Sequence, residues 1–298
     1  IYRKSFDNVL RYNTEIGKHT IGALIGHNEF YYNDSGFSAS KKGLIDETIT
    51  NIGTGTEMSS IGGDESDNSM RSFFGRVNYD YDSKYLAEFS LRRDGASKFG
   101  RNRKYGTFPS FSLGYMLSKE SFMAAVNPYI QDVKIRGSWG KLGNDGGDGL
   151  NVYGWHGVYG LVGYSFNGTQ MNGLQLSRFG NDLLQWEEAE NKEIGLEFAT
   201  LKRRASVELN VYDRKTSNII RAAEVPITAG TTTPPFFNQA AMRNTGVEFN
   251  LNWRDQIGDF RYNIGGNFSY NKNKVIKFEG ELKEGFVDDG TGKMTWQT

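Results

Sequence analysis

The sequence contains no cysteine among its 298 residues. This absence excludes disulfide bridges, thiolate zinc sites, iron–sulfur clusters and cysteine nucleophiles. The three histidines, His19, His27 and His156, lie far apart and lack the spacing of a zinc hydrolase. Nucleophile elbows, phosphate-binding loops and dinucleotide fingerprints are missing as well. We therefore expect no enzymatic activity, no metal ion and no cofactor.

The sequence also has no excess of charge, since 35 basic residues balance 35 acidic ones. A nucleic-acid partner is therefore not expected. The chain has no apolar run long enough for a transmembrane helix, and its mean hydropathy is −0.57. A transmembrane β-barrel is compatible with these values, because only every second residue of its strands needs to be apolar.

Glycine and aromatic residues, by contrast, are abundant, with 37 Gly, 20 Phe, 16 Tyr and 5 Trp. Apolar and polar residues alternate clearly over residues 70–93, with a break at Asp82 and Ser83, which predicts a β-hairpin. The same pattern predicts hairpins that pair 194–198 with 205–211, 247–253 with 260–270, 9–15 with 20–31 and 108–117 with 133–139. We predict an all-β fold, a transmembrane antiparallel β-barrel of which about ten strands are present.

The connections between these strands alternate between short and long. Long polar segments are predicted at 33–69, 94–105, 141–188, 217–244 and beyond 272. Outer-membrane barrels follow this rule, with short periplasmic turns and longer extracellular loops. Helix is expected only in short loop pieces such as 123–127. A soluble one-sided sheet is the alternative, but no predicted helix is long enough to cover its apolar face.

The two faces of the predicted strands differ in chemistry. A face rich in Asn, Asp, Glu and Arg cannot form a dry core without a large desolvation cost, so it should line a water-filled or plugged lumen. The residues predicted to point outward to lipid are Val77, Phe89, Leu91, Val207, Leu209, Phe249 and Leu251. Those predicted to point inward are Arg76, Glu88, Arg92, Glu208, Glu248 and Asn250.

Several blocks of the sequence resemble the barrel of SusC/RagA-type TonB-linked outer-membrane proteins. They are residues 74–81 (FGRVNYDY), 91–100 (LRRDGASKFG), 108–115 (FPSFSLGY), 134–144 (KIRGSWGKLGN) and 244–253 (NTGVEFNLNW). The resemblance implies a 22-stranded barrel in the outer membrane of a Gram-negative bacterium. It also implies that residues 1–298 are an internal part of one barrel domain, with the plug, the TonB box, the signal peptide and the C-terminal strands outside the chain.

The resemblance further implies a function. Members of this group import oligomeric nutrients, most often glycans and sometimes peptides, beneath a SusD-like surface lipoprotein and with energy supplied through TonB. The expected partners are therefore outer-membrane lipid, this lipoprotein lid, TonB and the oligomeric substrate. Two alternatives stay open: a TonB-dependent receptor for a small chelate such as a siderophore or cobalamin, and a structural or adhesive β protein.

One aromatic-rich segment is the candidate binding site. Its residues are Tyr153, Trp155, Tyr159, Tyr164 and Phe166. Rigid aromatic planes beside polar groups are suited to stacking on sugar rings or packing against a partner protein. Packing of the loop on itself is the alternative. Long loops are the expected place for recognition, because they supply irregular groups that the repeating strands lack.

Overall fold

The computed structural model describes residues 1–44, 46, 48–49, 51–126, 128–147, 150–223, 225–230, 233–279, 285–288 and 294–297. The main strands are β1 (Tyr2–Ile16), β2 (His19–Leu44), β3 (Gly55–Tyr81), β4 (Tyr85–Ala96), β5 (Tyr105–Met116), β6 (Ile130–Asn144), β9 (Glu187–Thr200), β10 (Ala205–Ala222), β11 (Phe236–Ile257) and β12 (Phe260–Phe278). The remaining strands are β7 (Val158–Phe166), β8 (Thr169–Arg178), β13 (Gly285–Asp288) and β14 (Met294–Gln297).

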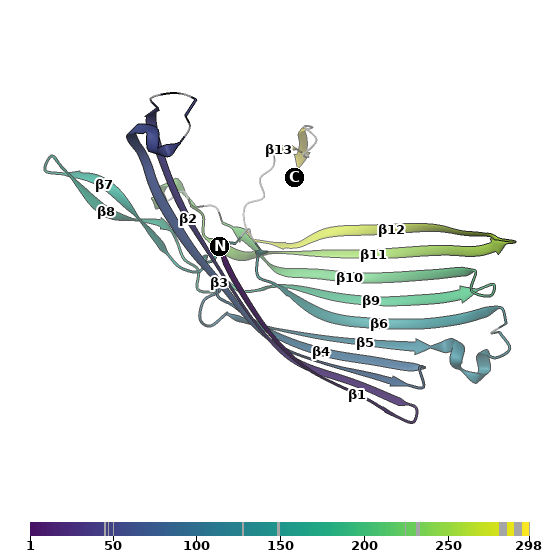
Figure 1. Ribbon diagram of the computed structural model, residues 1–298. Coiled ribbons are helices and arrows are strands. Elements are labelled where there is room, and N and C mark those ends of the chain that lie inside the picture. Colours follow the sequence, from purple (N-terminus) through teal and green to yellow (C-terminus); the bar gives the residue numbers. More distant parts are fainter. Residues whose placement is uncertain are drawn as a thin grey trace.

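The ten main strands form one antiparallel sheet in the order β1-β2-β3-β4-β5-β6-β9-β10-β11-β12, and the sheet is strongly curved (Figure 1). Within this sheet, strands that follow one another along the chain are neighbours, except that the separate β7–β8 hairpin lies between β6 and β9 in sequence; β13 and β14 form another two-stranded sheet. This is the topology of an up-and-down barrel wall. The predicted fold class is confirmed.

Helical structure in the described residues consists of short pieces of 3-10 helix, which include Ile52–Thr54, Leu117–Lys119, Ser121–Met123 and Ile227–Ala229. The helix predicted at 123–127 is wrong: the turn ends at Met123, and residue 127 lies outside the described residues. Pro128 follows this segment, and proline disfavours helical backbone at the residue before it, so the sequence does not sustain a helix up to that point.

In the described part of the chain, no helix combines the length and apolarity required to cross a bilayer.

Short turns lie together at one end of the sheet (Figure 1). They join β1 to β2, β3 to β4, β9 to β10 and β11 to β12, and residues such as Gly17, Asp82 and Gly258 adopt positive φ there. The connections at the other end are shorter than predicted, because the strands continue beyond the alternating stretches. Segment 33–69, for example, is largely a hairpin that stays paired as far as Leu44 and Gly55. The sequence of such a strand extension shows no apolar alternation, because backbone hydrogen bonds between the two strands hold it without a buried face.

The strand register confirms the predicted division into two faces. Val77 lies opposite Phe89, Leu209 opposite Phe249, and Val207 opposite Leu251. On the other face, Glu208 lies opposite Asn250 and Asn210 opposite Glu248. We call the first surface the apolar face and the second the polar face.

The apolar face is exposed along the whole sheet. Its exposed members include Leu10, Ile25, Val77, Phe89, Leu113, Ile135, Ile194, Val211, Leu251 and Phe268, which come from all ten strands. Aromatic residues such as Tyr85, Phe260 and Tyr262 lie where these strands meet the short turns, as in the aromatic girdle of a membrane barrel. A continuous exposed apolar band of this kind requires a hydrocarbon environment.

Among the described residues, a buried core cluster lies at the long-connection end, on the polar face. It consists of Ala96, Phe99, Phe108, Leu150, Leu184 and Trp186. Phe108 contributes from the wall strand β5, whereas Leu150 and Leu184 come from the long connection between β6 and β9. That connection therefore folds over the polar face, and part of it stands as the β7–β8 hairpin.

Candidate functional site

The polar face carries a network of charges centred on Arg136 of β6. Its guanidinium Nη1 lies 2.5 Å from Glu193, Nε lies 3.0 Å from Glu197, and Nη2 lies 3.0 Å from Glu208. Nη2 also donates to Asn210 at 2.7 Å. One cation thus ties together carboxylates from β9 and β10, and the site carries a net negative charge that water or a polar ligand has to solvate.

Gly195 provides the space for this network. A Cβ atom at that position would lie 2.7 Å from Nε of Arg136 and 2.8 Å from Oδ1 of Asn210. The guanidinium lies across the backbone of β9 because no side chain stands there. The packing of Arg136 and Asn210 thus explains why a glycine lies in the middle of an otherwise regular strand.

A polar hollow of about 650 Å³ opens on the same face, over β4, β5, β6, β9, β10, β11 and β12. Side chains that line it from this face include Glu88, Glu193, Tyr212, Arg214 and Asn244. Mixed carboxylates, amides and a guanidinium offer both hydrogen-bond donors and acceptors. Such a surface can bind a hydrated ligand rich in hydroxyl or amide groups.

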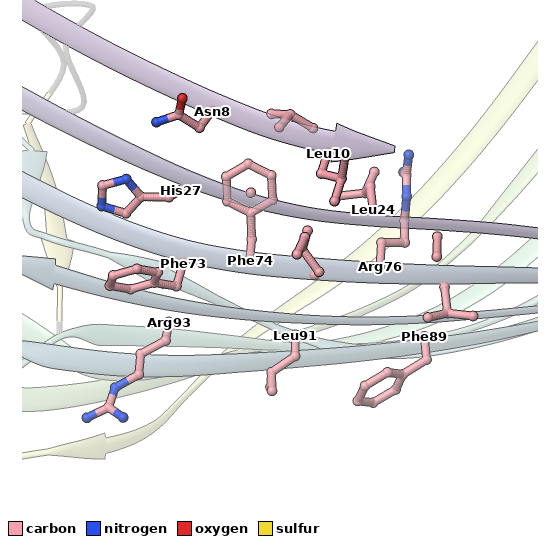
Figure 2. A pocket seen from close by; sticks show the side chains of 16 residues that line it. Asn8, Leu10, Leu24, His27, Phe73, Phe74, Arg76, Phe89, Leu91 and Arg93 are labelled. Carbon is pink, nitrogen blue, oxygen red and sulfur yellow. The ribbon is translucent and has the colours of Figure 1, made fainter. Parts of the chain in front are cut away.

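A second hollow, of about 830 Å³, lies over β1 to β4 and is lined mainly from the apolar face. Figure 2 shows Phe73, Phe89, Leu91 and Arg93 among its lining side chains. Gly75 lies among them and contributes no side chain to fill the space. Its apolar lining on the face that meets lipid can take up hydrocarbon, so we assign it no polar substrate.

The β7–β8 hairpin stands away from the wall, at the end opposite the short turns (Figure 1). Asn167 and Gly168 form its two-residue turn with φ of 50° and 77°. Positive φ at both positions is the geometry of a type I′ turn, which suits an Asn-Gly pair. The ring of Tyr164 lies over Gly173, where a Cβ atom would come within 2.6 Å of Cε1.

Both faces of this hairpin expose large apolar side chains. Leu161 is 80% exposed and lies opposite Leu174, which is 73% exposed. Phe166 on the other face is 67% exposed. A two-stranded hairpin with apolar groups on both sides has no core of its own. Its exposed surface is therefore suited to contact with another molecule.

The base of the hairpin is held firmly to the wall. Arg178, at the end of β8, is 7% exposed and donates through Nη2 to the carbonyl of Tyr153 at 2.9 Å. Nε1 of Trp155 donates to the carbonyl of Ser97 at 3.2 Å, and the Tyr153 hydroxyl accepts from the amide of Asp67 at 3.2 Å. Burial lowers the pKa of Arg178.

The structure thus separates the five predicted binding residues into two groups. Tyr153 and Trp155 lie at the base and are bonded to neighbouring segments. Tyr159, Tyr164 and Phe166 lie on β7 and are at least half exposed. Tyr153 and Trp155 are thus bonded to neighbouring segments and the β7 residues present exposed aromatic surface, and binding by these five residues stays a prediction.

Sequence reasoning missed Leu161, Leu174 and Met171, which are exposed on the same hairpin. The signal was present in the turn itself, because Asn167-Gly168 is a pair typical of a two-residue type I′ hairpin turn. The prediction of an aromatic loop over residues 153–166 therefore leaves out the apolar partners on the second strand.

No group of three or more His, Asp or Glu side chains suited to a metal ion occurs among the residues that the structure describes.

An antiparallel curved sheet with short turns at one end, an exposed apolar face and a polar face defines a transmembrane β-barrel of the outer-membrane type. Residues 2–293 match the family described as TonB dependent receptor-like, beta-barrel. The chain belongs to this family.

Similar proteins place the chain more closely. It is 32% identical to the TonB-dependent receptor P3 of Formosa agariphila over 96% of this chain and 28% of that protein. It is 28% identical to the TonB-dependent receptor SusC of Bacteroides thetaiotaomicron over 94% of this chain and 28% of SusC. The structure of the RagAB peptide transporter superimposes with a TM-score of 0.84 at 25% identity, covering 99% of this chain and 35% of that one.

The predicted resemblance to the SusC/RagA group is confirmed, as is the location in the outer membrane of a Gram-negative bacterium. The chain spans little more than a quarter of the length of these curated relatives.

Proposed function

We propose that the receptor to which this barrel wall belongs imports oligomeric nutrients, glycans or peptides, through the outer membrane. In this proposal TonB supplies the energy and a SusD-like surface lipoprotein acts as the lid. The similarity to SusC and to the RagAB peptide transporter supports the substrate classes and the kind of partner. We further propose that residues 1–298 are part of a single barrel domain, and that the receptor binds and translocates its substrate without converting it.

The β7–β8 hairpin is the observation that carries the proposal. By the rule of short periplasmic turns it lies on the extracellular side, opposite the turns. Its apolar side chains are exposed on both faces, which is costly for a hairpin surrounded by water alone. A lid protein that packs against Leu161 and Leu174 would cover this surface.

The polar face supports the choice of substrate. A glycan or peptide carries many donors and acceptors, and it keeps part of its hydration during passage. The hollow beside Glu193 and Arg214 offers complementary groups along the wall. A small chelate would need a compact binding site instead of an extended polar surface.

The test replaces the apolar surface of the hairpin in the intact receptor. Leu161→Glu combined with Leu174→Glu should reduce co-purification of the lipoprotein lid and growth on the cognate oligomer. The matched control, Gln170→Glu with Asn172→Glu, adds two charges to exposed polar positions of the same hairpin and should retain both. Unchanged lid binding in the leucine variant would reject the hairpin as the contact.

Substrate class is tested separately by uptake. Oligosaccharides or peptides should compete with the cognate nutrient for entry, and ferric siderophores or cobalamin should not. Competition by a chelate alone would favour the small-chelate receptor. Binding of a surface partner with no TonB-dependent uptake of any solute would favour the structural or adhesive alternative.

A further inference from the structure

A strip of cations runs along the outward side of the sheet, just beyond the long-connection edge of the apolar band. We call it the basic strip, and it consists of Lys192 on β9, Lys215 on β10, Arg243 on β11, and Lys272 and Lys274 on β12. All five residues are exposed.

The strip begins where the hydrocarbon-facing surface ends. Ile194, Val211, Val247 and Tyr270 form one cross-strand row of the apolar face. The next outward residues on the same strands form the row Lys192, Asp213, Thr245 and Lys272, and the row after that is Glu190, Lys215, Arg243 and Lys274, so its one carboxylate lies at the β9 end. Two residues along a strand span about 7 Å. The cations therefore lie at the level of the lipid headgroups.

Like charges face each other directly in this strip. Lys215 is opposite Arg243, and Arg243 is opposite Lys274. Directly opposed side chains on an antiparallel pair have Cβ atoms only about 5 Å apart, and like charges at that spacing are destabilising. A bound anion between them would remove this cost.

Only part of this charge is neutralised by the protein. Asp213 accepts from Nε of Arg243 at 2.7 Å and from Nη2 at 2.6 Å. Lys192 lies 3.3 Å from Glu190. Within the residues that the structure describes, Lys215, Lys272 and Lys274 form no ion pair. The strip thus has a positive surplus on its β10–β12 side.

The opposite face at the same level differs. There Arg214 donates to Asn191 at 2.7 Å, and Asn273 donates to Asn244 at 2.7 Å. These side chains form hydrogen bonds with one another through their amide groups, and Arg214 is the charged member. The row of cations is therefore a property of the outward face and not of this part of the sheet as a whole.

We propose that the basic strip binds the phosphate groups of anionic lipid headgroups in the outer leaflet. The long connections mark this end as extracellular. Lysine stems can lie along apolar surface while their ammonium groups reach the headgroups, and phosphates accept charge-assisted hydrogen bonds from Lys and Arg. Clusters of basic residues beside a hydrophobic span attract anionic lipid in this way.

The experiment measures lipid retention by the intact receptor. The receptor is purified in neutral detergent and titrated with diphosphorylated lipid A, and bound lipid is counted by native mass spectrometry. The triple variant Lys215→Gln, Lys272→Gln and Lys274→Gln should weaken retention at least about tenfold. The control triple Arg11→Gln, Arg76→Gln and Arg214→Gln removes three cations from the polar face and should stay within about twofold. Arginine at the three lysine positions should restore retention.

Further arms separate the sources of binding. Lipid A without phosphates should bind at least about tenfold more weakly than the diphosphorylated form, and millimolar inorganic phosphate should compete only partly, because it lacks the acyl chains. Equal loss in both triple variants, or equal retention of the dephosphorylated lipid, would overturn the proposal. So would a lysine variant that changes the oligomeric state in light scattering but keeps the lipid, because the strip would then be a contact between receptor copies. Proteolytic resistance at the level of the unmodified receptor confirms that each variant is folded.

Discussion

Tyr85 and Tyr115 lie parallel across β4 and β5, with ring centroids 5.1 Å apart and planes 7° apart. Both hydroxyls donate to Oε1 of Glu120, at 2.9 and 2.5 Å, and Lys84 lies 2.6 Å from Oε2. Glu120 belongs to the turn after β5, so this group fastens the turn to the ends of two strands. Its aromatic members lie where membrane barrels carry an interfacial girdle.

These contacts make the turn sensitive to acid. The ammonium of Lys84, together with the hydroxyls of Tyr115 and Tyr85, lowers the pKa of Glu120 from 4.5 to about 2. A lowered carboxyl pKa stabilises the fold above the unfolded value and loses that contribution as pH falls from about 4.5 to 2. Glu120→Gln should therefore lower the melting temperature at pH 7 and have little effect near pH 2. Circular dichroism of both proteins in detergent checks this, and a difference independent of pH would contradict it.

The assignment of the apolar face predicts a cost for charge on it. Leu209 lies in the middle of the apolar stretch of β10, between Val207 and Val211. Leu209→Arg should destabilise the folded barrel by about 2–4 kcal/mol, the value for Arg near the bilayer midplane. Asn250→Arg on the polar face, close to Glu208, is the control and should cost less than about 1 kcal/mol. Equilibrium unfolding in lipid vesicles measures the free energy of unfolding of both variants. Equal costs would contradict the assignment of Leu209 to the lipid-facing side.

A third prediction concerns the space at Gly195. Gly195→Ala would place a methyl group against Arg136 and Asn210, so the guanidinium has to move away from its carboxylates. We expect a loss of about 1–3 kcal/mol, as for other overpacked sites. Gly137→Ala is the matched control, because the nearest atom to its new Cβ would be 4.0 Å away. Chemical denaturation of the two variants should separate them; equal stability would show that Arg136 adjusts freely.

Much of the wall could be predicted from the sequence, because a period of two over strands such as 205–211 follows directly from one face in lipid and one in water. The extensions of β2 and β3 beyond the bilayer could not, since both of their faces meet water or other loops and no alternation is imposed there. The roles of Tyr153 and Trp155 depend on carbonyl and amide groups from residues 97 and 67, which no local pattern reveals. The basic strip could not be predicted, because its residues come from four strands and only the register brings them together.

The division of the aromatic segment into a base and a projecting strand predicts different outcomes for Trp155 and Tyr164. Trp155→Ala removes the bond to the Ser97 carbonyl and part of the packing under the hairpin. It should increase proteolytic cleavage around residues 158–178 and reduce lid association as a consequence of the loosened base. Tyr164→Ala leaves the base intact and removes only exposed surface above Gly173. It should leave protease resistance unchanged while lowering lid association or growth on the cognate oligomer.

Trp155→Phe keeps most of the packing but not the indole donor, so it measures the hydrogen bond alone and should fall between the native receptor and Trp155→Ala in protease resistance. Limited proteolysis of whole cells, co-purification of the lid and growth on the oligomer are measured for all three variants. If Tyr164→Ala retains both lid association and growth, recognition has to be carried by other long segments, 33–69 or 217–244, which also lie at the long-connection end. If Trp155→Ala keeps full protease resistance, the base is held by Arg178 and Tyr153 without it.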